Sequence, residues 1–356
     1  MDNNKEKILI TGGAGFIGSN LVDFYLKKGA EVIVFDNFSR SGVEYNLGEL
    51  KKSGDFSFVK GDVRNFDDLK SVFKNHPKIT TIFHEAAQVA VTTSVNNPKE
   101  DFEINVLGTL NTLEAFRNFS PDAVFIYAST NKVYGGLDDL KIIEKESRYE
   151  FEDRDYKNGI PEKRCLDFHS PYGCSKGAAD QYVRDYSRIY NLKTVVFRQS
   201  CIYGPRQFGI EDQGWVAWFI ARILFNKEIT LYGTGKQVRD ILFIDDLISA
   251  YDLTVKNIEI AKGKIYNIGG GANNSISLLE LIHYLEELIS IKIKYNFADW
   301  RHGDQKIFIS DNSLASENLN WVPQINWKDG VKKLYFWLKN NQALLEKTYK
   351  THPGFF

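Results

Sequence analysis

KILITGGAGFIG, residues 7–18, is the stretch of sequence that decides the fold. Its first five residues form a short apolar run typical of a buried strand, and an apolar helical pattern follows the glycines. The glycines permit a tight turn, let the backbone approach a pyrophosphate and let the helix pack closely on the strand. The helix N-terminus then offers unpaired N–H groups to the phosphates. The stretch therefore predicts a dinucleotide site that includes Gly12, Gly15, Phe16, Ile17 and Gly18.

Strand-like and helix-like segments alternate through the first half of the chain. The strand-like runs are residues 7–11, 31–36, 56–62, 81–87, 123–129 and 193–200, and helical patterns lie between them, as at 20–28 and 102–116. Parallel strands need a crossover, usually a helix, and near-continuous apolar strands indicate burial on both faces. We therefore predict an α/β fold, a Rossmann-type doubly wound parallel sheet.

The alternation loosens after Ser200. Residues 201–214 are rich in Gly, Pro and polar side chains, whereas 215–225 and 277–289 return to helical patterns and 265–271 resembles a further sheet strand. We expect an NAD-binding Rossmann domain at 1–200 with a returning strand near 264–271. Residues 201–350 would mainly form a smaller, interleaved substrate lobe.

Composition limits the classes of function. The chain has 356 residues and a formal net charge of -1, which gives no global electrostatic case for nucleic acid or anionic membrane as a partner. The first residues lack the apolar segment of a signal peptide, and no stretch is long and apolar enough to span a bilayer. Three cysteines without paired spacing predict reduced thiols, a cytoplasmic location and no metal site.

A carboxylate at the end of the second expected strand points to the identity of the dinucleotide. Asp36 lies about 20 residues beyond the glycine turn, where an acid can bind the ribose hydroxyls and disfavour a 2′-phosphate. Arg40 weakens this preference for NAD over NADP, and Asp36 could instead cap the next turn. Asp62 and Val63, at the end of the third strand, are placed to meet the adenine.

A second set of residues carries the chemistry. Tyr172 and Lys176 are four residues apart, so on a helix they project to the same side. A nearby ammonium, together with a positive nicotinamide ring, would lower the tyrosine pKa and let Tyr172 take a hydroxyl proton as hydride leaves. Ser129 and Thr130, at the end of a strand, can hydrogen-bond the developing oxyanion. The alternative, a Tyr and a Lys on a solvated helix face, does not account for all three elements in order.

With these motifs the chain resembles the extended short-chain dehydrogenases/reductases, and within them the nucleotide-sugar epimerases and dehydratases. The segments that carry the resemblance, from about residue 7 to about 339, are GGAGFIG (12–18), FHEAAQ (83–88), NVLGT (105–109), ASTNKVYG (128–135), YGCSK (172–176) and RDILFIDD (239–246). The resemblance implies NAD as cofactor and Tyr172, Lys176, Ser129 and Thr130 as catalytic residues. It extends the cofactor contacts to Asn37, Ser39, Arg40, Ala86, Ala87, Gln88, Asn105, Tyr172 and Lys176.

Three longer stretches, residues 166–177, 197–207 and 211–219, are similar to the subgroup that inverts C2 of a CDP-linked deoxysugar, of the CDP-paratose to CDP-tyvelose type. The implied substrate contacts are Asn131, His169, Gln199, Ser200, Arg206, Gln207, Arg239 and Arg301, with Arg239 and Arg301 clamping the diphosphate. Dehydratases of the family place an Asp-Glu pair where this chain has Asn131 and Lys132, so dehydration lacks its usual acid.

The resulting hypothesis is an NAD-dependent epimerase that transiently oxidises C2 of a CDP-linked deoxysugar and then returns the hydride to the opposite face. Such an activity belongs to lipopolysaccharide O-antigen biosynthesis. The rival readings are a 4-epimerase of a UDP- or GDP-sugar and, in another class, a non-catalytic NAD-sensing protein. The resemblance also implies a homo-oligomer, either a dimer or a tetramer.

Overall fold

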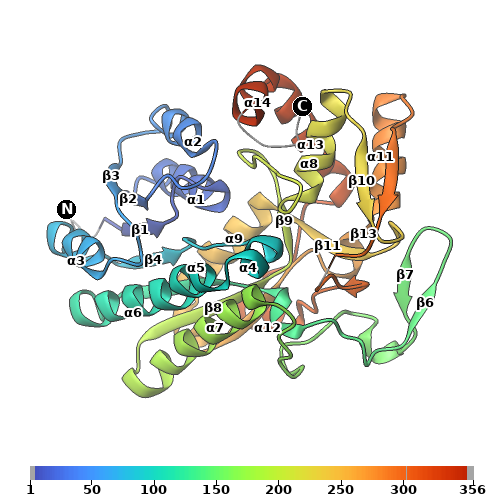
Figure 1. The fold of residues 1–356 in the computed structure, drawn as a ribbon. Helices are drawn as coiled ribbons and strands as arrows, with labels where there is room; N and C mark the ends of the chain where they lie inside the picture. Colours follow the sequence, from blue (N-terminus) through green and yellow to red (C-terminus); the bar gives the residue numbers. More distant parts are fainter. Residues whose placement is uncertain (1–4, 302, 351–356) are drawn as a thin grey trace.

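The computed structural model describes residues 5–301 and 303–350. Its centre is a seven-stranded parallel sheet with strand order β12-β8-β5-β4-β1-β2-β3 (Figure 1). The strands are β1 (Lys7–Thr11), β2 (Glu31–Asp36), β3 (Ser57–Lys60), β4 (Thr81–His84), β5 (Val124–Thr130), β8 (Lys193–Gln199) and β12 (Ile265–Ile268). The predicted doubly wound α/β fold is therefore confirmed.

Side chains alternate between the two faces of this sheet because successive strand residues point in opposite directions. Leu9, Ile33 and Ile82 join one core, beneath α3 (Phe66–Asn75), α6 (Gly108–Phe119) and α7 (Pro171–Tyr190). Ile8 and Ile10 join the core of the other face, beneath α1 (Phe16–Lys27) and α9 (Ile244–Lys256). Burial on both faces explains why these strands are apolar throughout.

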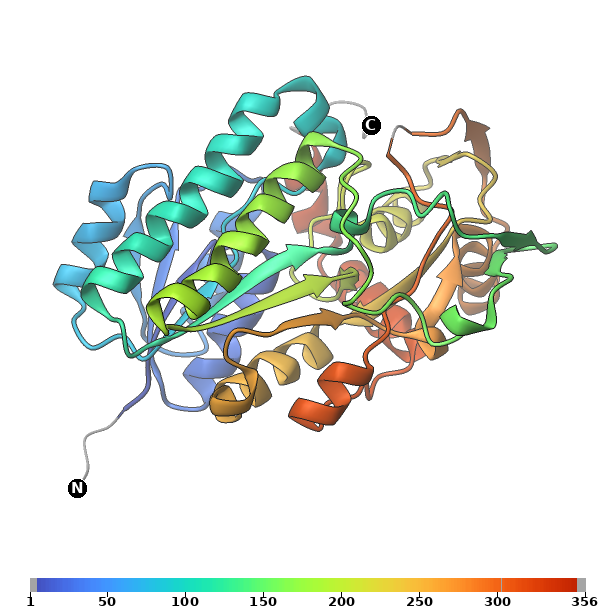
Figure 2. The same cartoon turned by 90° about the horizontal axis from the view of Figure 1, so that it is seen from below.

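The second core continues from the sheet into the C-terminal half of the chain. It includes buried residues of α8 (Trp215–Leu224), α11 (Leu278–Ile289) and α13 (Trp327–Asn340). Figure 2 shows these later segments grouped at one end of the sheet, beyond the ends of β5 and β8. The strand β12 leaves this group and pairs with β8 at the sheet edge.

Small sheets complete this C-terminal group. The strand β11 (Val238–Phe243) pairs with β9 (Cys201–Tyr203), β13 (Ser275–Ser277) and β15 (Ile307–Phe308). A parallel pair joins β10 (Ile229–Tyr232) to β14 (Tyr295–Ala298), and β6 (Ile142–Glu144) forms a hairpin with β7 (Tyr149–Phe151). The remaining helices are α2 (Val43–Leu50), α4 (Val91–Asn96), α5 (Pro98–Phe102), α10 (Ile258–Ala261), α12 (Ser313–Leu319) and α14 (Gln342–Tyr349).

One helix differs from its predicted form. The sequence pattern predicts a single helix over residues 102–116, but the structure has α5, then a π-helical turn at Glu103–Leu107, then α6. The turn carries Asn105, whose side-chain amide donates to the backbone oxygen of Gln88 and to Ser175. A π-turn is a local rearrangement that often marks a functional site. Within the described residues, no helix is both long and apolar enough to cross a membrane.

Candidate functional site

The glycine turn between β1 and α1 forms a cradle of bare backbone. Gly12 has φ of +67°, and a Cβ there would lie 2.7 Å from the backbone nitrogen of Ala86. A Cβ on Gly18 would lie 2.2 Å from the carbonyl oxygen of Gly12. Both glycines are therefore required, the first by its φ and its neighbour and the second by the close approach of helix to turn.

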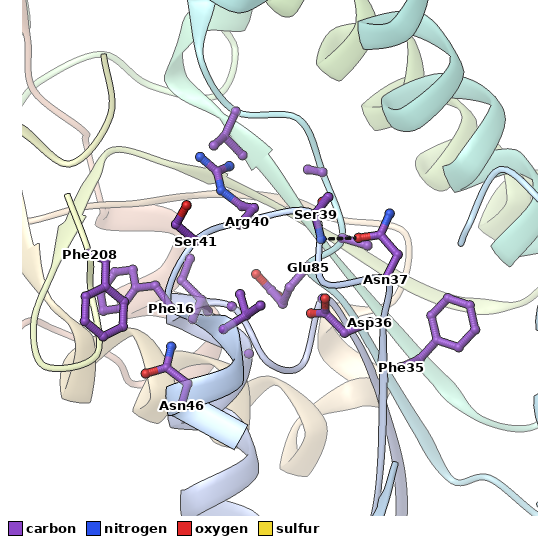
Figure 3. A pocket seen from close by; sticks show the side chains of 18 of the residues that line it. Phe16, Phe35, Asp36, Asn37, Ser39, Arg40, Ser41, Asn46, Glu85 and Phe208 are labelled. Atoms are coloured by element: carbon purple, nitrogen blue, oxygen red, sulfur yellow. Dashed lines mark hydrogen bonds between the residues drawn. The ribbon is translucent and has the colours of Figure 1, made fainter. Parts of the chain in front are cut away.

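A cavity of about 190 Å³ opens over this turn (Figure 3). Most of the predicted cofactor residues line it, namely Gly12, Gly15, Phe16, Ile17, Gly18, Asp36, Asn37, Ser39, Arg40, Asp62, Val63, Ala86 and Ala87. Its wall thus combines the glycine cradle with the ends of β2, β3 and β4, which is the position at which open α/β sheets bind ligands.

Asp36, at the end of β2, has both carboxylate oxygens engaged by backbone. Oδ2 accepts from the N–H of Ala14 at 3.1 Å, and Oδ1 accepts from the N–H of Phe38 at 2.9 Å. Burial raises the pKa of Asp36, while these backbone donors and the charge of Arg40 lower it. Asp36 therefore braces the glycine turn and the next loop, and it still lines the cavity with acceptor capacity left.

Asp62 and Asn37 line another part of this cavity and are hydrogen-bonded to each other. Arg64 donates to Asp62 through Nε at 3.0 Å and Nη2 at 2.7 Å, and Asn37 donates at 3.0 Å. The hydrogen bonds from Arg64 lower the pKa of Asp62 to about 2. Asn37 in turn accepts from the N–H of Ser39 at 3.0 Å (Figure 3).

Two predicted cofactor residues lie behind the wall instead of in it. Gln88 donates to Ala90 and to Asp101, and its backbone N–H donates to Asn105 at 2.9 Å. Neither Gln88 nor Asn105 is among the residues that line the cavity. Together with Asp101 and Ser175 they form a hydrogen-bonded layer beneath α7.

A second cavity of about 350 Å³ lies between the carboxyl ends of β5 and β8 and the C-terminal lobe. The predicted residues that line it are Ser129, Thr130, Asn131, Tyr172, Gln199, Ser200, Gln207, Arg239 and Arg301. Phe16, Ile17, Val89, Gln207 and Gln213 line both cavities. The two spaces therefore adjoin, and Tyr172, the predicted acid/base residue, lies on the side of the second.

Helix α7 places Tyr172 and Lys176. Ser170 caps the helix by accepting from the N–H of Gly173 at 3.0 Å, and Pro171 occupies the first turn, where its missing N–H costs nothing. Tyr172 therefore lies in the first turn and lines the second cavity. Lys176, one turn later, is buried with Nζ 4.3 Å from the centre of the Tyr127 ring and lines neither cavity.

The structure gives the tyrosine a different pKa from the one expected. Burial raises the pKa of Tyr172 to about 12, although a hydrogen bond with the Thr130 side chain and the charge of Arg40 lower it. Burial lowers the pKa of Lys176 to about 8. Desolvation thus opposes the charged form of both groups in the chain alone, and the lowered tyrosine pKa stays a prediction for the protein with NAD bound.

Ser129 and Thr130 play different structural parts. The Ser129 hydroxyl donates to Asp180 at 3.0 Å, and the same carboxylate is paired with Arg198 at 2.8 Å. Thr130 caps the short 3-10 helix Asn131–Tyr134 by accepting from the N–H of Lys132, and its hydroxyl donates to the Asn131 side chain at 3.3 Å. Of the two hydroxyls, that of Thr130 is the one that lowers the pKa of Tyr172, the predicted acid/base residue, with which it lines the second cavity.

The predicted substrate residues are only partly brought together. Ser200 donates to Asp240, and Gln207 donates to the backbone of Ile202 at 3.1 Å. Arg206 lines the first cavity and not the second. His169 is exposed, its Nδ1 accepts from the N–H of Gly136 at 3.1 Å, and it lines neither cavity.

The two predicted diphosphate arginines border the second cavity and hold acidic partners. Arg239 Nη2 lies 2.5 Å from Asp304 Oδ1, and Arg301 Nη2 lies 3.2 Å from Asp212. Arg301 also lies over the Tyr232 ring, with 3.8 Å between its guanidinium carbon and the ring centre. Acidic or aromatic side chains thus hold both guanidinium groups at the cavity. A bound diphosphate could replace the carboxylates as their partner.

Sequence reasoning missed several residues of these walls. Lys132 points its Nζ at the carbonyl oxygen of Gly303, 3.4 Å away, and lies 3.7 Å from Asp304. Burial lowers its pKa to about 8. The sequence shows that Lys132 replaces an acid of the dehydratases. Its contacts with residues 303 and 304 could not be predicted, because those residues lie about 170 positions later in the sequence. Glu85, in the first cavity, was not predicted, because its contact with Tyr251 joins residues 166 positions apart in the sequence.

The site can therefore hold a dinucleotide along the glycine turn and a second ligand beside Thr130 and Tyr172. Its arginines suit an anionic ligand in the second cavity. Within the described part of the chain, no group of three or more His, Cys, Asp or Glu side chains could hold a metal ion.

Comparisons with known proteins agree with this geometry. The family model described as GDP-mannose 4,6 dehydratase matches residues 9–334. CDP-paratose 2-epimerase of Salmonella typhi is 49% identical over 336 residues, which cover 93% of this chain and 98% of that protein. UDP-glucose 4-epimerase of Thermotoga maritima, solved with UDP-glucose, has a TM-score of 0.81 at 30% identity and covers 94% of this chain and 99% of its own. UDP-glucuronic acid 4-epimerase of Bacillus cereus, solved with UDP-glucuronic acid and NAD, has a TM-score of 0.80 at 29% identity, with 94% and 99% covered.

The matches extend over nearly the whole chain and include both cavities. The resemblance expected from the motifs is confirmed. The chain belongs to the nucleotide-sugar epimerases and dehydratases of the GDP-mannose 4,6 dehydratase family, within the extended short-chain dehydrogenases/reductases.

Proposed function

We propose that this chain is an NAD-dependent epimerase that inverts C2 of a CDP-linked deoxysugar, of the CDP-paratose to CDP-tyvelose type. The observation that carries the proposal is the 49% identity to CDP-paratose 2-epimerase over 93% of the chain. The second cavity supports it, because Asn131 and Lys132 stand where a dehydratase has its acid pair.

NAD fits the first cavity by the chemistry of its wall. The glycine cradle leaves room that a Cβ would fill, and Asp36 provides an acceptor at the end of β2. Lys176, beneath the Tyr172 turn, is the cation assigned to the nicotinamide ribose. When bound, NAD accepts a hydride from the sugar carbon and later returns it.

The chain's own residues supply the proton chemistry. Tyr172 removes the proton from the sugar hydroxyl, and Thr130, which lines the same cavity, holds the sugar oxygen during the transfer. With NAD bound, Lys176 and the positive ring of the cofactor would together favour the phenolate form of Tyr172. The chain alone does not stabilise that form. Ser129, tied to Asp180 and Arg198, supports the strand end beneath Thr130.

Inversion requires the ketone to present its other face while its nucleotide stays bound. We assign Arg239 and Arg301 to the diphosphate, with Asn131, Gln199, Ser200 and Gln207 along the sugar. Arg206 and His169 keep their predicted substrate roles as proposals, which the variants Arg206→Ala and His169→Ala would test through KM. Residues 1–200 together with β12 would act as the NAD-binding domain, and residues 201–350 mainly as the substrate lobe.

The direct test is a panel of CDP-, UDP- and GDP-sugars, with NMR of the products. We expect inversion at C2 of a CDP-sugar without net formation of NADH. Inversion at C4 of a UDP-sugar would favour the rival suggested by the 4-epimerase relatives. An absence of turnover with retained NAD would favour a non-catalytic NAD sensor.

We also propose that the protein is a homo-oligomer in the cytoplasm. Large apolar side chains are exposed on α4, α5, the π-turn and α7, namely Val95, Phe102, Leu107, Tyr182, Ile189 and Tyr190. The long helices α6 and α7 lie side by side on one face of the sheet (Figure 2). Analytical ultracentrifugation of the wild type and of Ile189→Glu tests this: the wild type should be a dimer or tetramer, and a wild-type monomer would contradict the proposal.

A further inference from the structure

A chain of buried hydrogen bonds runs from the wall of the first cavity to the wall of the second. Glu85 follows β4 and lines the first cavity, where Figure 3 shows it between Phe16 and Asp36. Its Oε1 accepts from the Tyr251 hydroxyl at 2.5 Å. The Tyr251 oxygen in turn accepts from Nε2 of Gln199 at 2.8 Å, and Gln199 lines the second cavity.

Packing fixes the middle member of this chain. Tyr251 lies on α9 and is fully buried, and its ring contacts those of Phe83 and Phe197 with centres 5.2 and 4.9 Å apart. Burial and the neighbouring Glu85 charge raise the pKa of Tyr251, so the hydroxyl keeps its single hydrogen. Because it has one hydrogen, it donates in only one direction at a time.

The direction in which the Tyr251 hydroxyl donates its hydrogen bond determines which atom of the Gln199 amide faces the second cavity. A carboxylate can only accept, so an ionised Glu85 takes the hydrogen of Tyr251 and leaves the tyrosine oxygen as an acceptor. The amide nitrogen of Gln199 must then face Tyr251, and the carbonyl oxygen is the group that remains for a ligand. Gln199 is the last residue of β8 and lies opposite Thr130 in the sheet, at the reacting end of the second cavity.

We infer that Glu85 is a positioning residue for the sugar: through Tyr251 it orients Gln199 so that its carbonyl oxygen accepts a hydrogen bond from a hydroxyl group of the substrate. The inference rests on the proposed function in that it requires a hydroxylated ligand in the second cavity. It adds two residues, Glu85 and Tyr251, neither of which touches that ligand.

The same arrangement makes substrate binding respond to pH. Burial raises the pKa of Glu85 to about 7, while Tyr251 and the Lys176 charge lower it. The other groups around it are Asp36, Arg40 and Arg206, which line the same cavity, and His84, whose pKa burial lowers to about 3 so that it stays neutral. Below about pH 7 a protonated Glu85 can itself donate to Tyr251, which frees the tyrosine hydrogen to turn toward Gln199 and reverse its amide.

The test compares Tyr251→Phe with Tyr266→Phe. Both remove a buried hydroxyl close to Phe197, but the Tyr266 hydroxyl has no hydrogen-bond partner among the residues that the structure describes. We expect Tyr251→Phe to raise the KM for the nucleotide sugar about tenfold, as for the loss of one oriented hydrogen bond, with kcat changed less than about threefold. NAD content should stay at the wild-type level in both, and Tyr266→Phe should match the wild type throughout.

The pH dependence separates positioning from a simple structural effect. In the wild type and in Tyr266→Phe, KM should rise as pH falls from 8 to 6, whereas in Tyr251→Phe and Glu85→Gln it should be flat. If Tyr251→Phe keeps a KM within twofold of the wild type, or keeps its pH dependence, the inference is overturned. Exposed Glu150→Gln provides the control for loss of one negative charge.

An infrared titration makes the result independent of the substrate. A buried carboxyl group that gains a proton near pH 7 should give a C=O band in the wild type that is absent in Glu85→Gln and displaced in Tyr251→Phe. If the sugar panel finds no substrate, the proposed function fails while this band still tests the Glu85–Tyr251 contact. A wild type without such a band contradicts the pH dependence, because Glu85 then stays ionised, and the KM of Tyr251→Phe against that of Tyr266→Phe decides the orientation of Gln199.

Discussion

At the scale of single residues, the fold places the Tyr172 phenol and the Thr130 hydroxyl in the wall of the second cavity and buries the Lys176 ammonium one helical turn behind the phenol. Tyr172 and Lys176 are both desolvated, so each resists the charge that catalysis requires. Burial holds the tyrosine neutral in the chain alone, and a bound NAD would add a positive charge that favours the phenolate. We therefore expect acid/base chemistry at Tyr172 only when the cofactor is bound.

The first prediction concerns Tyr172→Phe. The change removes the only ionisable oxygen of that side chain and keeps the ring, so packing in the first turn of α7 should persist. Because general acid/base catalysis contributes about 10²–10⁴-fold, turnover should fall by about that factor. Steady-state kinetics measures it, and released NAD should equal that of the wild type. Nearly unchanged activity would assign the base to another residue.

The second prediction concerns the choice of dinucleotide at Asp36. Denaturing the purified protein should release NAD, because the carboxylate repels a 2′-phosphate. Asp36→Asn keeps the size and one acceptor for Ala14 or Phe38 but removes the charge. We expect it to move the ratio of NAD to NADP affinity toward NADP by about tenfold. Release of mostly NADP from the wild type would contradict the role given to Asp36.

At the scale of elements, the glycine turn depends on the contact of α1 with the backbone of its own turn. A Cβ on Gly18 would meet the Gly12 oxygen at 2.2 Å, so Gly18→Ala must push the helix away from the phosphate site. We expect NAD content to drop and the free energy of unfolding to fall by about 1–3 kcal/mol, as in other overpacked sites. The measurements are cofactor content and urea unfolding.

Gly48→Ala is the matched control for that change. Gly48 lies within α2, and a Cβ there would meet nothing within 4 Å. Because alanine favours a helix over glycine by about 1 kcal/mol, the control should be neutral or stabilising, with unchanged NAD content. Equal NAD loss in both variants would show that the cradle is not the sensitive feature.

The central elements could be predicted from sequence because burial on both faces leaves a continuous apolar signal, as in β1 and β2. The expected strand at residues 56–62 is shorter in the structure, Ser57–Lys60, since β3 is an edge strand that pairs only with β2 and alternates between half-buried and exposed residues. The π-turn at Glu103–Leu107 could not be predicted, because an apolar period does not distinguish it from an α-helix. Some residues of the cavity walls could not be predicted for another reason. Lys132 contacts Gly303, and Glu85 contacts Tyr251, only through tertiary structure.

At the scale of the whole molecule, one hydrophobic core includes residues of the sheet and of the C-terminal helices α8, α11 and α13. The walls of both cavities are therefore supported by the same core. Helix α9 belongs to this core and carries Tyr251, which lies between the cavities. A ligand in either cavity therefore contacts elements that the other cavity also uses. This arrangement suits a reaction in which one cofactor molecule takes a hydride and gives it back without leaving.

The last prediction tests that cycle and the carbon at which it occurs. A CDP-linked deoxysugar deuterated at C2 should give product with the deuterium still at C2, because the hydrogen travels as hydride to the bound cofactor and back. Mass spectrometry and NMR of the product measure the retained label, and the wild-type rate should show a primary isotope effect. Loss of deuterium to solvent would require proton abstraction at carbon and would contradict the hydride cycle. Inversion at C4 with C2 untouched would move the chain to the 4-epimerases, whereas the roles of Asp36, Tyr172 and the glycine cradle would stand because they depend on the cofactor and not on the sugar carbon.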